Sequence, residues 1–170
     1  MTIKLLPYTR EKAHEFYKNY ISDPAIFSSN EKYKSYEYKA YQVDDFFNSH
    51  VGLKSRKYFA IDLNGRTIGE ISLKFINKKE KSATLSIALI NDSVKGLGYG
   101  TEAEKLIIEY GFTSLGLNII YADTILRNKR SQHVLEKVGF KYIKTDKDLK
   151  YYELKKEAWF YTTNFNIRVL

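Results

Sequence analysis

The sequence predicts an α+β fold whose mixed, mostly antiparallel sheet contains one parallel strand pair. Segments rich in β-branched and aromatic residues predict three consecutive strands at 57–63, 67–76 and 82–90. A predicted helix over 101–115 separates the third of these strands from another at 119–126. A helical crossover joins parallel neighbours, so the strands on either side of this helix are expected to pair in parallel.

Shorter elements are expected on both sides of this core. Asn64-Gly65 is a strong hairpin signal between the first two strands. Further elements are a strand at 3–8, helices at 10–20, around 43–47 and at 129–138, and an antiparallel pair at 140–144 and 151–155. In the tail 160–170, Phe165, Ile167 and Val169 are spaced like a strand, which would extend a sheet edge or contact a second subunit of a homodimer.

The composition is that of an ordinary globular protein. The chain has 170 residues, of which 44% are hydrophobic and 28% charged, and no low-complexity linker divides it. We therefore expect a single domain over 1–170. The absence of cysteine excludes a disulfide scaffold, a thiolate zinc site and a cysteine nucleophile. His14, His50 and His133 lie far apart in the sequence, so no metal site is expected.

The charge balance is basic. There are 28 Lys and Arg against 20 Asp and Glu, a net charge of +8. Such a surplus suits nucleic acid, anionic lipid or a polyanionic small molecule. The lysines are spread along the chain, which favours a solvated basic surface over a nucleic-acid face. No apolar stretch approaches the roughly 20 residues of a membrane span, and no signal-peptide core follows the first basic residue. We expect a cytoplasmic protein with no membrane partner.

The most informative segment is the glycine-rich turn at 94–101, which follows a strand and opens a helix. Three glycines within five residues allow positive φ and close approach to a ligand. Backbone N–H groups at a helix N-terminus, together with the helix dipole, suit a phosphate. The segment lacks the ending of a Walker loop, and its Gly-x-Gly-x-Gly spacing differs from the dinucleotide fingerprint. A flexible strand-to-helix turn is the competing interpretation.

Two motifs resemble the GNAT acetyltransferase superfamily. Lys95-Gly96-Leu97-Gly98-Tyr99-Gly100-Thr101 is similar to the loop, written Arg/Gln-x-x-Gly-x-Gly/Ala, that binds the acyl-CoA pyrophosphate in this family. The segment 128–140 resembles the family's second motif. The closing Tyr151-Tyr152-Glu153-Leu154 and Trp159 are similar to the branch of ribosomal-protein N-terminal acetyltransferases. The resemblance implies a sheet of about six to seven strands with helices on both faces, and a splayed parallel pair that holds acyl-CoA.

The resemblance also implies cofactor-binding residues, with acetyl-CoA as co-substrate. Backbone groups of Leu89 and Ile90 would contact the pantetheine arm. The loop from Lys95 through Thr101 would bind the pyrophosphate. Asn128 would contact the arm with an amide that both donates and accepts, although Asn128 is equally suited to be the N-cap of the following helix.

One departure from the family affects the chemistry. Many members place a tyrosine, acting as general acid, where this chain has Leu135. Ser131, beside Asn128, is the nearest substitute donor, although a first-turn hydroxyl is a simpler interpretation of it. For the general base we predict Glu70, because a carboxylate within a strand is unusual unless it faces a cleft, with Asp123 in reserve. A solvent-facing strand residue is the alternative for Glu70.

The sequence thus predicts an N-acetyltransferase that transfers the acetyl group of acetyl-CoA to a primary amine, a protein N-terminus or a small molecule, by direct attack in a ternary complex. The aromatic and cationic stretch 31–41 is expected to border the acceptor pocket. The alternative is a catalytically silent CoA-binding or nucleic-acid-associated module, motivated by Leu135 and the basic surface.

Overall fold

A single seven-stranded sheet organises the protein. The computed structural model describes residues 2–168. The strands are β1 (Lys4–Pro7), β2 (Lys57–Leu63), β3 (Arg66–Asn77), β4 (Ser82–Leu89), β5 (Ile119–Ile125), β6 (Lys141–Asp146) and β7 (Leu149–Lys155). The α-helices are α1 (Arg10–Asn19), α2 (Ala40–His50), α3 (Tyr99–Thr113), α4 (Lys129–Val138) and α5 (Lys156–Arg168).

The strand order is β1-β2-β3-β4-β5-β7-β6, and β4–β5 is its parallel pair. All other neighbours are antiparallel. The predicted fold class is therefore confirmed, including the helical crossover through α3 that makes β4 and β5 parallel. The predicted turn at Asn64-Gly65 is also confirmed, because both residues have the positive φ that such a hairpin turn requires.

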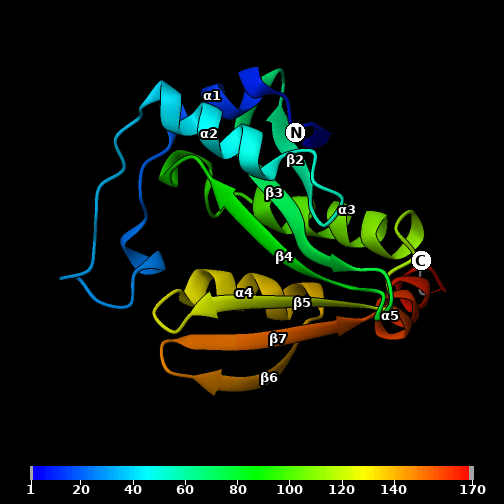
Figure 1. Ribbon diagram of the computed structural model, residues 1–170. Coiled ribbons are helices and arrows are strands. Elements are labelled where there is room, and N and C mark those ends of the chain that lie inside the picture. Colours follow the sequence, from blue (N-terminus) through cyan, green and yellow to red (C-terminus); the bar gives the residue numbers. More distant parts are fainter. Residues whose placement is uncertain (1, 169–170) are drawn as a thin grey trace.

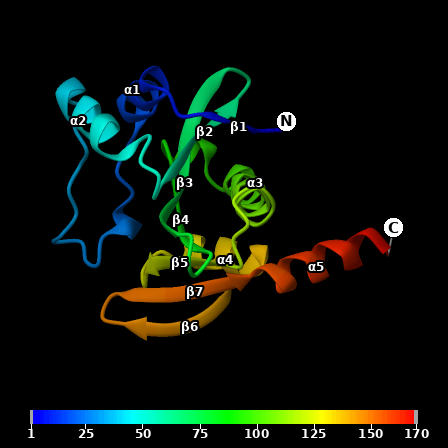
Figure 2. The same ribbon diagram turned by 45° about the vertical axis from the view of Figure 1, so that its right-hand side comes forward.

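Helices cover both faces of the sheet (Figure 2). The α1–α2 layer contributes Ala13 and Val43 to a small apolar cluster with Ala60 of β2. The next residue, Ile61, points to the opposite face and joins the main core with Ile107 and Phe112 of α3. This alternation is what a strand buried on both faces requires. Away from the register shifts at Ile61/Asp62 and Lys74/Asn77, it assigns the residues of β2, β3 and β4 to one of two faces.

The strands β4 and β5 separate along their length (Figure 1). Their parallel register runs only from Ser82 opposite Ile119 to Leu85 opposite Ala122. Beyond this point β4 continues in register with β3, and β5 continues in register with β7. Beyond Leu85 and Ala122, β4 therefore stays paired with β3 and β5 with β7, while β4 and β5 no longer pair with each other. The splayed pair expected from the resemblance is present, and side chains from both strands line cavities at this gap.

Two details differ from the sequence predictions. The tail was expected to form a strand, but 156–168 is the helix α5, while 169–170 lie outside the described residues. The period-two pattern predicted there was wrong because a helix begins at Lys156. The helix is anchored by the indole of Trp159, which donates to Glu109 of α3 at 2.7 Å. Helix α3 begins at Tyr99 rather than at Thr101, since Gly98 serves as its N-cap.

Candidate active site

The inner edge of β4 offers unpaired backbone groups to the gap. The Ile90 amide donates to Ile68 of β3 at 3.0 Å. In an antiparallel ladder, backbone groups of alternate residues point to the same neighbour. Since Ile90 bonds to β3, Leu89 and Ile87 direct their N–H and C=O groups away from β3, toward the side where β5 has departed.

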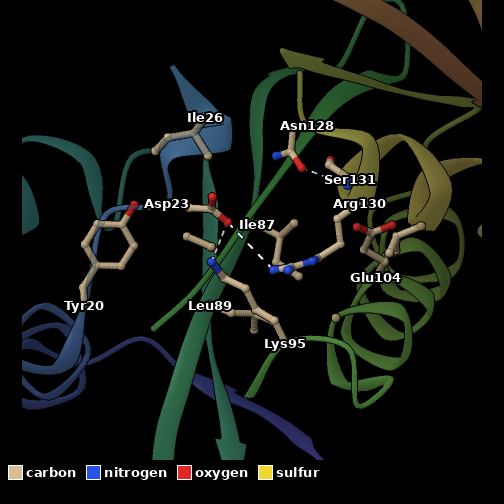
Figure 3. Close-up of a pocket in the computed structure, with 13 residues that line it drawn as sticks. Tyr20, Asp23, Ile26, Ile87, Leu89, Lys95, Glu104, Asn128, Arg130 and Ser131 are labelled. Atoms are coloured by element: carbon tan, nitrogen blue, oxygen red, sulfur yellow. Dashed lines mark hydrogen bonds and ion pairs between the residues drawn. The ribbon is translucent and has the colours of Figure 1, made fainter. Parts of the chain in front are cut away.

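This geometry separates the two predicted contacts and adds a third residue. The Ile90 amide donates to Ile68 and its carbonyl accepts from the Ile21 amide at 2.7 Å, so both of its backbone groups already have partners within the protein, and its contact with a pantetheine arm stays a prediction. Leu89 keeps the predicted orientation. Ile87 was missed, although the alternation along the strand could have identified it once Leu89 was selected. Side chains of Ile87 and Leu89 line the gap (Figure 3).

The glycine-rich loop presents free amides at the end of the same gap. Gly96 and Gly98 have φ values of 76° and 89°, which glycine adopts at little cost. Within the described residues 2–168, the backbone N–H groups of Gly96, Leu97 and Gly98 have no hydrogen-bond partner. They precede the positive end of the α3 dipole, so this loop can bind a phosphate group. Thr101 lies within the first turn of α3, because the N-cap of the helix is Gly98.

Cations and carboxylates meet beside this loop. The Lys95 ammonium lies 2.6 Å from Asp23 and 3.3 Å from Asp92. Arg130 of α4 reaches the same two carboxylates at 3.9 and 3.2 Å. Partial burial opposes the shift, but hydrogen bonds from Lys95 and from the Ala25 amide, together with the charges of Lys95 and Arg130, lower the pKa of Asp23. Asp23 belongs to the segment after α1, so these ion pairs join that segment to the loop across the gap (Figure 3).

Asn128 and Ser131 lie at the mouth of the gap. The Asn128 side-chain oxygen accepts from the Ser131 amide at 3.0 Å, which makes Asn128 the N-cap of α4. Its NH₂ group keeps its donors, and the side chain lines both cavities between β4 and β5. The cap therefore holds Asn128 in a fixed position without consuming its amide donors. Ser131 also lines both cavities.

Glu70 lies on the α1–α2 face of the sheet, next to the gap strand. It is paired in register with Ala88 of β4, and Ala88 lines the first cavity. The Tyr8 hydroxyl donates to the Glu70 carboxylate. Burial raises the pKa of Glu70, while the Tyr8 hydrogen bond and the charge of Lys74 oppose the shift. Glu70 itself lines neither cavity between β4 and β5, and its role as base stays a prediction. Asp123, the reserve candidate, is exposed on β5 and lines the second cavity.

A wall of tyrosines connects Glu70 to the first cavity. Tyr8 stacks on Tyr58 with ring centroids 5.8 Å apart. Tyr17 and Tyr20 each lie 5.5 Å from Tyr36, which comes from the stretch predicted to border the acceptor pocket. Tyr20 lines the first cavity. Burial and the charge of Glu70 raise the pKa of all five phenols, so they remain neutral near pH 7.

Glu104 is a buried carboxyl that the sequence analysis missed. It is 2% exposed on α3 and lines both cavities. Its Oε2 has no hydrogen-bond partner among the described residues. Burial raises its pKa to about 8. The signal was available, because Glu104 lies one turn before Ile107 and Ile108 on the apolar stripe of the helix.

Neither a metal cluster nor a membrane span is found in the described part of the chain. No three His, Cys, Asp or Glu side chains converge within 2–168 as metal ligands would. None of the helices there is both long and apolar enough to cross a bilayer. The expectation that the protein needs no metal stays a prediction.

Comparison with known proteins decides the family. A model of the acetyltransferase (GNAT) domain matches residues 2–141. The chain belongs to the GNAT acetyltransferase family. The family predicted from the glycine-rich loop and the segment 128–140 is thus confirmed.

Several relatives of this GNAT chain are polyamine enzymes. Spermidine N(1)-acetyltransferase of Escherichia coli (strain K12) is 31% identical over 104 residues, which cover 61% of this chain and 55% of the relative. A probable N-acetyltransferase of Bacillus subtilis, YjcK, is 36% identical over 75 residues, covering 44% and 41%. The alignments thus span about half the length of these curated relatives.

Solved structures share the fold of the GNAT chain. A chimera based on spermidine N-acetyltransferase from Vibrio cholerae aligns with a TM-score of 0.78 at 20% identity, covering 94% of this chain and 99% of that one. The Vibrio cholerae enzyme in complex with CoA and spermine aligns with a TM-score of 0.77 at 19% identity, covering 94% and 98%.

Proposed function

We propose that the protein is an acetyl-CoA-dependent N-acetyltransferase whose acceptor is a polyamine or a similar small primary amine. One observation carries the proposal. The half-buried Glu70 and its tyrosine wall adjoin a strand gap that leads to a loop of free amides. An acceptor site and a phosphate site therefore lie at the two ends of one passage. The gap between them is where a thioester would have to lie.

The phosphate end fits an acyl-CoA. The amides of Gly96, Leu97 and Gly98 would bind the pyrophosphate, with Lys95 supplying positive charge. The backbone groups of Ile87 and Leu89, with the amide of Asn128, match the alternating donors and acceptors of a pantetheine arm. Ser131 lies along the same path. Free backbone amides of β4 are also suited to stabilise the oxyanion of a tetrahedral intermediate.

The acceptor end fits a cationic amine. A free alkylamine has an ordinary pKa near ~10.4, so a proton must leave before its nitrogen can attack. Glu70 is the proposed base, because burial moves its pKa from the usual carboxyl range toward neutrality. Neutral tyrosine rings attract the further ammonium groups of a polyamine by cation–π interaction. Attack is direct, so no enzyme nucleophile is needed.

The proposed acceptor, a polyamine, differs from the protein N-terminus that the motifs near the C-terminus suggest. The motifs at 151–159 resemble ribosomal-protein acetyltransferases, whereas the E. coli relative and the Vibrio cholerae structures are spermidine acetyltransferases. A carboxylate among tyrosines favours the small polycation. The Vibrio cholerae protein has also been solved as a dodecamer. Self-association of this chain is accordingly part of the proposal.

The test is a thiol-release assay with acetyl-CoA and a panel of spermidine, spermine, a monoamine and an N-terminal peptide. We expect turnover with the polyamines and little with the peptide. CoA binding without turnover on any amine would favour the catalytically silent module. Salt-sensitive binding of short RNA without CoA binding would favour a nucleic-acid module.

A further inference from the structure

The gap between β4 and β5 separates two carboxyls. Glu70 belongs to the sheet face covered by α1 and α2, since it is paired with Ala60 and Ala88. Glu104 belongs to α3, which packs against the opposite face and contacts β4 and β5. Glu104 therefore lines the gap directly, whereas Glu70 lies on the other face of the sheet, beside Ala88, which lines the first cavity.

Nothing in the surrounding structure explains Glu104 as a structural residue. It has no ion pair or hydrogen bond within the described residues 2–168, although a buried carboxyl ordinarily has one. Its immediate neighbours on the helix stripe are apolar. The side chain lines both cavities of the gap, so its carboxyl adjoins the space that a ligand would fill (Figure 3).

Apart from Glu104, the described residues that line the gap on the α3 side offer no strong proton donor. Leu135, which is 2% exposed and lines the second cavity, offers no hydroxyl. Ser131 has a hydroxyl there, but an unperturbed aliphatic alcohol is a weak acid. A protonated carboxyl, by contrast, can both donate a hydrogen bond and release its proton.

We propose that Glu104 in its protonated form is the general acid that protonates the CoA sulfur as the acetyl group leaves. The inference rests on the proposed acetyltransferase function. Glu70 first takes the ammonium proton and passes it to solvent. The neutral amine nitrogen then forms the new C–N bond and transfers a second proton to Glu70. The C–S bond breaks, its electron pair stays on sulfur, and the Glu104 proton completes the CoA thiol. Solvent then removes the proton from Glu70 and returns one to Glu104.

Protonation of Glu104 at working pH follows from its surroundings. Burial alone raises the pKa of this carboxyl to about 8. The charged groups that line the same cavities are Asp23, Lys95 and Arg130 on one side and Arg56, Lys74 and Asp123 on the other. None of them contributes to the shift, because burial is its one cause. An ordinary thiol has a pKa near ~8.5, so donor and leaving group are closely matched.

The kinetic test uses Glu104→Gln, which keeps the shape and a hydrogen-bond donor but cannot release a proton. We expect kcat to fall about 100-fold with the Kd for CoA nearly unchanged, and the alkaline limb of the kcat profile to disappear. Glu102→Gln, two residues earlier on α3 and outside both cavities, is the matched control and should keep that limb. A Glu104→Gln enzyme with wild-type kcat and an intact alkaline limb would overturn the proposal.

A second measurement needs no acceptor and no turnover. Infrared difference spectra of the wild-type protein at pH 6.5 should show a protonated carboxyl band, absent from Glu104→Gln, that shifts on addition of CoA. Desulfo-CoA, which lacks the thiol, should leave the band in place. Equal shifts with both ligands, or no such band, would exclude contact with the sulfur. A CoA-specific shift in a protein that acetylates no amine would refute the proposed function while the placement of Glu104 stands.

Discussion

At the residue scale, the proposed chemistry depends on two buried carboxyls. Glu70 is the proposed general base and Glu104 the proposed general acid. Both have a pKa above the ordinary carboxyl range, but their partners differ. Glu70 accepts a hydrogen bond from Tyr8, which opposes the effect of burial, whereas Glu104 has no such partner. Burial thus raises the pKa of both carboxyls, and they differ in the hydrogen bond that only Glu70 receives.

Glu70→Gln should remove the base. Because the base must be ionised, wild-type activity rises with pH as Glu70 loses its proton, at a pH above the ordinary carboxyl range. We expect kcat/KM to fall by about 100- to 1,000-fold and the acidic limb to be lost. The measurement is kcat/KM for spermidine between pH 5 and 9. Asp123→Asn is the control, and loss of the acidic limb in that variant instead would transfer the role to Asp123.

Glu104→Leu should stabilise the fold while it impairs turnover. The carboxyl has a folded pKa of about 8 against an unfolded value of 4.5. Above the unfolded value the unfolded chain loses the proton more readily, so this group reduces stability as pH rises from 4.5 to about 8. At pH 7 the cost is about 3 kcal/mol. Urea midpoints at pH 5 and pH 8 should show a larger advantage of Glu104→Leu at pH 8. Equal advantages would contradict the buried-acid description.

At the element scale, the transition from β4 to α3 forms the phosphate site. The strand directs backbone groups into the gap, and the loop releases amides where the helix begins. Gly98 has no neighbouring atom within 4 Å of an added Cβ, but its φ is 89°. Conformation, and not space, therefore restricts this position to glycine.

Gly98→Ala should weaken cofactor binding. An alanine at this φ is strained by roughly 1–2 kcal/mol, which the loop can relieve by turning its amides away from the phosphate. We expect the KM for acetyl-CoA to rise about tenfold. Gly52→Ala is the matched control, because Gly52, just after α2, has a similar φ of 90° and equally free space around an added Cβ but lies outside the loop. A similar increase in both variants would argue against the loop amides as the binding element.

The same elements show what the sequence could predict. Periodicity located the strands of the sheet, and the crossover between 82–90 and 119–126 determined their parallel pairing. Spacing of the glycines located the phosphate loop. The tyrosine wall could not be predicted, because Tyr8, Tyr17, Tyr36 and Tyr58 come from four separate segments that only the tertiary fold brings together. The hydrogen bond from Ile21 to the Ile90 carbonyl likewise depends on a contact between distant segments that no local pattern encodes.

At the scale of the whole molecule, two half-sheets meet at a short seam. Four residue pairs join β4 to β5, from Ser82 to Leu85, whereas β3 and β4 remain in register to Leu89. On one side of the seam lies the unit with Glu70 and the tyrosines, and on the other the unit with Asn128 and Ser131. The ion pairs of Asp23 with Lys95 and Arg130 bridge the opening.

The net charge of +8 should separate the two substrates by their response to salt. A basic protein attracts anionic acetyl-CoA and repels a polycation, and added salt screens both effects. Between about 50 and 500 mM NaCl we expect the KM for acetyl-CoA to rise several-fold and the KM for spermidine to stay constant or fall. Steady-state kinetics at fixed pH measures both. A parallel rise in both constants would show that local carboxylates dominate acceptor capture.

The placement of Glu70 and Glu104 on opposite faces of the sheet has a consequence for the catalytic cycle. Each turnover leaves one face with an extra hydrogen ion and the other with one too few, and the filled gap blocks a direct return path. Bulk water must therefore remove the proton from Glu70 and supply one to Glu104 in two separate exchanges before the next turnover. Two such exchanges would show kinetically as a steady-state rate that depends on buffer concentration. They would also give a solvent deuterium isotope effect larger than that of a single proton transfer.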